Sequence, residues 1–120
     1  MFAVAALAVL RPPQLSPEAQ FAVHRSDFAA IAAGYRSITS TTTLPVPLRF
    51  LSSDGQVHPS CDPFDGCALY LPAWVDWRGE TGVGFAWFRD GGARGSQVLT
   101  AEGDIGSAVR ELGDGWWWVE

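Results

Sequence analysis

Three consecutive tryptophans near the end of this 120-residue chain, Trp116 to Trp118, constrain its fold more than any other feature. They follow a Gly-Asp-Gly turn at 113–115, so they are predicted to form the second strand of a hairpin. Because successive strand residues point to opposite faces of a sheet, Trp117 must point away from its two neighbours. Both faces of this last strand therefore carry bulky apolar groups that require cover.

The one convincing helix pattern lies at residues 16–38. Ser16 is a good N-cap, and Pro17 suits the first helical position. Apolar and aromatic side chains recur at the spacing of one helix face, at Phe21, Phe28, Ile31, Tyr35 and Ile38. We therefore predict one N-terminal amphipathic helix with one buried face.

After residue 40, short apolar runs alternate with turn residues, which is typical of antiparallel strands. Pro45 and Pro47 should confine the first strand to an edge, since proline cannot donate a ladder hydrogen bond. The candidate strand segments are 45–52, 56–60, 67–77, 81–90, 96–103, 107–112 and 116–120. The prediction is a single α+β domain at 16–120, with the helix packed on an antiparallel meander sheet of about five or six short strands in two layers.

One helix covers only one face of such a sheet, so the second face needs another cover. The candidates are the apolar N-terminus, a protein partner, a membrane surface and a ligand; alternatively, loops bury part of the surplus tryptophan surface. We favour a binding role for this face. The predicted binding residues are Trp74, Trp77, Arg78, Trp87 and Trp117.

The two cysteines of the chain, Cys61 and Cys67, bracket a short turn. A zinc site could add His58 with Asp62 or Asp65, but the spacing is long and no second cysteine pair exists. A C-x-x-C redox motif and a full set of calcium ligands are both missing. A disulfide is therefore the favoured prediction, with no metal and no cofactor. Reduced cysteines in a cytoplasmic protein are the alternative.

Residues 1–15 comprise an apolar run, 2–10, and a proline-rich linker. The run is too short to span a bilayer, but it has the length of a signal-peptide core. It is interpreted as a truncated signal or anchor, as an arm docked on the domain, or as an interfacial segment. All eight basic residues are arginine, which indicates a GC-rich coding sequence. We expect a bacterial cell-envelope or secreted protein, membrane-anchored or exported.

The charge and the motifs disfavour several classes of function. A net charge of −5 without a cluster of arginines argues against nucleic-acid binding. His24 and Asp27, three residues apart on the predicted helix, could join Ser60 or Ser96 in a hydrolytic set, but no G-x-S-x-G motif is present. An enzyme is therefore the less favoured interpretation.

Several functional hypotheses follow from these patterns. The first is a non-catalytic domain that binds a protein partner, or a membrane-proximal surface, through an aromatic sheet face. The second is a glycan-binding module in which Trp74 and Trp77 stack on sugar rings of the cell wall. The third is a small hydrolase centred on His24 and Asp27. An acidic inhibitor protein fits the charge but has no supporting motif.

Overall fold

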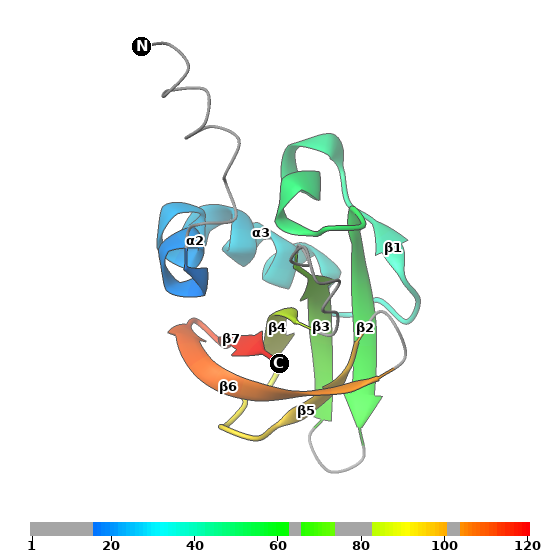
Figure 1. Cartoon of the computed structure of the whole chain (residues 1–120). Coiled ribbons are helices and arrows are strands. Elements are labelled where there is room, and N and C mark those ends of the chain that lie inside the picture. The colour runs from blue at the N-terminus through cyan, green and yellow to red at the C-terminus, as the bar shows by residue number, and fades with distance from the viewer. Residues whose placement is uncertain (1–15, 63–65, 74–82, 101–103) are drawn as a thin grey trace.

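The computed structural model describes residues 16–62, 66–73, 83–100 and 104–120 (Figure 1). These residues form two helices, a 3₁₀ helix and one sheet of seven antiparallel strands. The helices are α2 (Pro17–Val23), α3 (Arg25–Tyr35) and the 3₁₀ helix η2 (Val46–Leu51). The strands are β1 (Thr42–Thr43), β2 (Gln56–Asp62), β3 (Gly66–Pro72), β4 (Gly84–Phe88), β5 (Gln97–Leu99), β6 (Ile105–Gly113) and β7 (Trp116–Val119). The α+β class with an antiparallel sheet is confirmed, and the described strands exceed the predicted five or six.

The predicted single helix is two helices that meet at His24. The Ser16 hydroxyl caps α2 by accepting a hydrogen bond from the Ala19 N–H at 3.1 Å, as the sequence indicated. The backbone of His24 then ends α2 and begins α3, at φ −112° and ψ 29°. No proline or glycine at this position signalled the break. Phe21 and Phe28 remain on the same side and are buried against the sheet.

The predicted strand at 45–52 is wrong, because Val46–Leu51 forms a 3₁₀ helix. Proline suits the first turn of a helix, where no intrahelical partner is needed for its missing N–H. The Leu48 N–H donates to the Pro45 carbonyl at 2.9 Å, which closes the first turn. Strand β2 pairs with Thr42–Thr43 instead.

The order of the strands is β1-β2-β3-β4-β7-β6-β5, and the sheet curls strongly. Strand β6 bends around the molecule (Figure 1), with two register irregularities against β7 that are typical of bulges. The curl brings β5, at one end of the sheet, beside β2, near the other end. The Leu99 N–H donates to the Ser60 hydroxyl at 3.0 Å across the seam between these two strands.

The curled sheet buries both of its faces. The helix-facing core contains Phe28, which contacts Phe85 and Trp116 at centroid distances of 4.9 Å. The second core is enclosed by the sheet itself and consists of Ala68, Tyr70, Ala86, Phe88, Val98, Ala108, Trp117 and Val119. Trp116 and Trp117 point to opposite faces, as predicted. The sheet thus covers its own second face, which corrects the expectation that another element or a partner must do so.

The two buried tryptophans of β7 differ in their hydrogen bonding. Trp117 Nε1 donates to the Gly91 carbonyl at 2.8 Å, whereas Trp116 Nε1 is buried with no acceptor among the described residues. We expect Trp117→Phe to lower the free energy of unfolding by about 1 kcal/mol more than Trp116→Phe, since only the first loses a hydrogen bond. Urea denaturation of both variants measures the difference. An equal loss would contradict this assignment of the two indole groups.

Candidate binding surface around Trp87

The disulfide between Cys61 and Cys67 is present and joins β2 to β3. The two residues are direct register partners, with their Cα atoms 4.0 Å apart. No group of three metal-ligating side chains occurs in the described part of the chain. His58, the third ligand of the zinc alternative, instead bonds Asp54 and Thr41. The disulfide fixes the β2–β3 hairpin at the end that β1 does not reach.

A small hollow of about 20 Å³ lies beside the disulfide, and we name it the Trp87 hollow. Its walls come from the end of α3 and from β2, β3 and β4. The lining residues are Arg36, Ile38, Pro59, Cys61, Cys67, Ala68, Leu69, Trp87 and Arg89. Trp87 is half-buried here, because α3 ends at Tyr35 and leaves part of the indole uncovered. Behind it, Gly115 has φ +88°, and a Cβ there would lie 2.9 Å from Trp87 Nε1.

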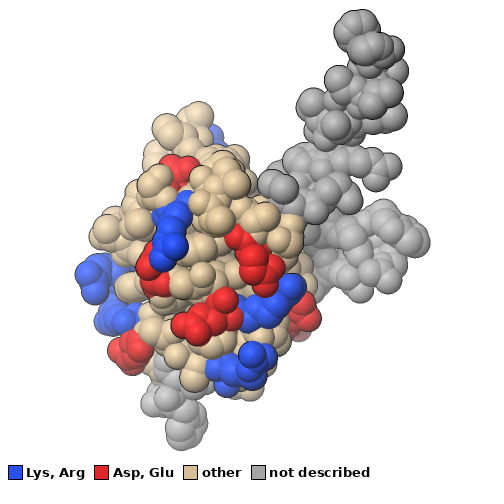
Figure 2. All heavy atoms as spheres, turned by 90° about the vertical axis from the view of Figure 1, so that its left-hand side faces the viewer, with Lys and Arg blue, Asp and Glu red and all other residues tan. Residues whose placement is uncertain are grey.

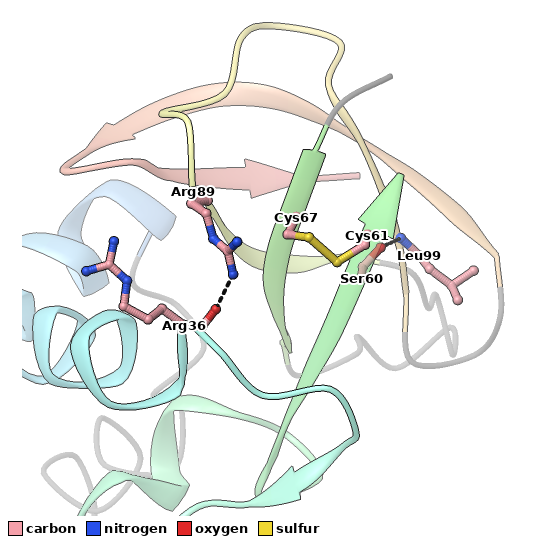
Figure 3. The surroundings of a disulfide bond; sticks show 6 residues. All are labelled: Arg36, Ser60, Cys61, Cys67, Arg89 and Leu99. Atoms are coloured by element: carbon pink, nitrogen blue, oxygen red, sulfur yellow. Dashed lines mark hydrogen bonds between the residues drawn. A yellow bond between two sulfur atoms is a disulfide. The ribbon is translucent and has the colours of Figure 1, made fainter. Parts of the chain in front are cut away.

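Two exposed arginines flank Trp87. The Arg36 guanidinium carbon lies 5.7 Å from the centroid of the indole, within the range of a cation–π contact. Arg89 reaches back from the end of β4 and donates from Nη2 to the Arg36 carbonyl at 2.6 Å (Figure 3). Neither arginine forms an ion pair with a carboxylate among the described residues. The hollow therefore gathers two positive charges in a protein whose net charge is −5.

Two other arginines of the described part do pair with carboxylates. Arg25 Nε lies 2.7 Å from Asp114 Oδ2, and Arg110 Nη1 lies 3.3 Å from Glu18 Oε2. On the side of α2 and the β6–β7 hairpin, basic and acidic residues are interspersed (Figure 2). Arg49 and Arg94, like Arg89, donate to backbone carbonyls. Arg36 and Arg89 are therefore distinguished by lying together beside the half-buried Trp87.

A larger groove of about 300 Å³ follows the seam between β2 and β5. No charged residue lines it; the lining residues are Pro59, Ser60, Cys61, Gln97, Val98, Leu99 and Ile105. The side chains of Leu99 and Ile105 are 46% and 60% exposed. The groove shares Pro59 and Cys61 with the Trp87 hollow, so an apolar surface adjoins the positively charged one.

The structure separates the predicted binding residues. Trp87 lies at the surface hollow, but Trp117 is only 6% exposed and belongs to the interior of the curled sheet. Trp74, Trp77 and Arg78 lie outside the described residues.

The predicted hydrolytic set is brought together only in part. His24 Nδ1 lies 3.5 Å from Asp27 Oδ2, and the His24 ring contacts Phe50 edge-on at 4.8 Å. Ser60 and Ser96 bond elsewhere, to the Leu99 and Ala93 N–H groups. The helix spacing thus predicted the His–Asp contact, whereas neither serine joins it.

Sequence reasoning missed a hydrogen-bonded chain of Thr41, His58 and Asp54. His58 Nε2 lies 2.7 Å from Asp54 Oδ2, and His58 Nδ1 lies 3.0 Å from Thr41 Oγ1. When the proton is on Nε2, the imidazole donates to Asp54 and accepts from the Thr41 hydroxyl. The i, i+4 spacing of Asp54 and His58 was visible in the sequence, but the approach of Thr41 depends on the pairing of β1 with β2. The chain ties the start of β1 to the turn before β2.

No protein-family model, curated protein or solved structure matches this chain. In the described part, none of the helices is both long and apolar enough to cross a membrane.

Reduction of the disulfide should destabilise the fold. The cysteines are six residues apart, and closing so small a loop in the unfolded chain corresponds to about 2 kcal/mol. We expect a reducing agent to lower the free energy of unfolding by this amount in urea denaturation. The double variant Cys61→Ala with Cys67→Ala should show the same loss and no response to reductant. A reductant effect that persists in the double variant would contradict the prediction.

The Asp54 carboxylate should stabilise the fold in a pH-dependent manner. Partial burial raises the pKa of Asp54, but hydrogen bonds from Ser52, His58 and the Gln56 N–H outweigh it and hold the pKa below its usual value. Because the pKa of Asp54 is lower in the folded than in the unfolded state, its ionised carboxylate stabilises the fold fully above about pH 4. This stabilisation is lost as the pH falls through the pKa of Asp54 in the folded state.

We therefore expect Asp54→Asn to lower the urea midpoint at about pH 5, with a smaller difference from the native protein at about pH 2. The control is Asp104→Asn, which makes the same change of charge at an exposed carboxylate. A loss for Asp54→Asn that stays constant with pH would exclude the carboxylate as its cause.

Proposed function

We propose that this protein is a non-catalytic binding module that recognises a protein partner through the Trp87 hollow and the adjoining seam groove. The observation that carries the proposal is the pair of arginines, Arg36 and Arg89, which lie around a half-exposed tryptophan and have no carboxylate partner among the described residues. Tryptophan and arginine are the residues most enriched among the dominant contacts of protein interfaces. Leu99 and Ile105 add exposed apolar area next to them, in the combination of apolar centre and polar rim that interfaces use.

The rigidity of this surface supports the same proposal. The disulfide joins β2 and β3, two of the strands that line the hollow, and the Arg89 side chain is held by its bond to the Arg36 carbonyl. A surface ordered before binding loses less conformational freedom when a partner arrives. We propose further that the protein works in an oxidising compartment outside the cytoplasm, because a disulfide persists there. The apolar run at 2–10 motivates export or membrane tethering.

The other hypotheses lack a comparable observation. The glycan-binding residues Trp74 and Trp77 lie outside the described residues, so that function stays a prediction. His24 and Asp27 contact each other, but neither predicted serine lies with them.

A displayed library of random peptides tests the proposal without knowledge of the partner. We expect peptides selected on the native protein to lose binding to Arg36→Glu, which reverses an exposed charge at the hollow without altering the core. Arg94→Glu is the control, because it makes the same change of charge at another exposed arginine, one that donates to the Val109 carbonyl away from the hollow. The proposed binding role of this surface would be wrong if the selected peptides bound both variants equally, or if no peptide could be selected on the native protein.

A further inference from the structure

We infer that the group received by the Trp87 hollow is a carboxylate of the partner, either an aspartate or glutamate side chain or a chain terminus. This inference rests on the proposed function and identifies the chemistry of the same surface. It follows from three features of the hollow: its two arginines, which have no carboxylate partner in the described part of the chain, its size, and its position at the end of a helix.

The charge of the hollow favours an anion. Arg89 uses an Nη2 N–H to bond the Arg36 carbonyl, and a guanidinium carries five N–H donors in all. Arg36 lies over an indole face, a contact that leaves its charge in place. Both side chains therefore keep donors for a ligand, and a guanidinium fork matches the planar geometry of a carboxylate. Of the carboxylates whose side chains the structure describes, none pairs with either arginine.

The size of the hollow favours one oxygen over a larger head group. A volume of about 20 Å³ holds about one water-sized group. A carboxylate can insert one oxygen and leave the other at the exposed rim, near the arginines. Much of the wall is apolar, with Ile38, Leu69 and the disulfide, so a tetrahedral phosphate would bring more oxygens than the wall can satisfy.

The position of the hollow favours a single negative charge. Arg36 is the C-cap of α3, so the backbone carbonyls at the end of this helix lie close by. The C-terminal end of a helix carries a partial negative charge that opposes anions. Arg89 offsets part of this negative charge, because its guanidinium donates to the Arg36 carbonyl. The remaining field penalises a dianion more than a singly charged carboxylate.

Titration with blocked tetrapeptides, followed by the side-chain Nε–H resonances of Arg36 and Arg89, tests the inference. The probes are acetyl-Gly-Glu-Glu-Gly-amide, acetyl-Gly-Gln-Gln-Gly with a free C-terminal carboxylate, acetyl-Gly-Gln-Gln-Gly-amide, and inorganic phosphate. We expect saturable shifts with one or both carboxylate peptides and none with the neutral one. The stronger of the two identifies the source as a side chain or a chain terminus.

Variants show whether the two arginines provide the site. Arg36→Gln and Arg89→Gln should each weaken carboxylate binding by about tenfold, the effect of losing one hydrogen bond between charged groups. The control Arg94→Gln removes the same charge and should leave the affinity unchanged. Arg36→Gln breaks no side-chain hydrogen bond of the described fold, so it remains informative if Arg89→Gln destabilises the protein, which urea denaturation reveals.

Several results would overturn the inference. These are binding of the neutral peptide as tight as that of the acidic ones, binding of phosphate tighter than that of either carboxylate, and an equal loss in Arg94→Gln. The proposed function is tested separately by the peptide library. If the selected peptides require Arg36 but contain no excess of acidic residues, the binding role is supported and the carboxylate assignment is wrong. If neither library peptides nor probes bind, both are wrong.

Discussion

The whole architecture depends on the burial of two apolar faces of one strand. On β7, Trp116 packs against Phe28 of the helix layer, while Trp117 points to the other side. Full burial of a large side chain contributes about 1.5–3 kcal/mol relative to exposure, so a flat sheet with one helix layer would lose most of this for Trp117. Instead, the sheet bends at β6, so that β5 lies beside β2. The second core is then enclosed by strands, and no further layer is required.

This solution also determines where the surface remains incomplete. The helices cover Phe85 but end at Tyr35, so Trp87, two residues further along β4, lies at the boundary of the helix layer. At the same end of the molecule, β2 runs beyond its short pairing with β1, and its Ser60 hydroxyl accepts a hydrogen bond from the Leu99 N–H of β5. The disulfide fixes β2 to β3 at this point. The hollow therefore lies where the helix layer ends, and the groove lies along the seam where the curled sheet brings β5 beside β2.

The sequence predicted what depends on local patterns. Strand alternation identified the opposite orientations of Trp116 and Trp117, and the short cysteine spacing indicated a cross-strand disulfide. The 3₁₀ helix at Val46–Leu51 was missed because its alternation fits a strand, and only its prolines argued against one. The curl could not be predicted, since it brings together residues far apart in the sequence, such as Ser60 and Leu99, which are 39 residues apart. For the same reason the sequence suggested Trp87 as a candidate binding residue but did not associate it with Arg36 and Arg89.

The exposed arginines of this protein differ in the groups that they contact. Arg25 and Arg110 meet carboxylates at exposed positions, where an ion pair contributes little and is screened by salt. Arg36 and Arg89 contact an indole and a backbone carbonyl, and neither partner cancels a unit charge. Under the proposed function, an arriving anion would gain hydrogen-bond donors from both arginines, so the two side chains that add little to the free fold would contribute most in a complex.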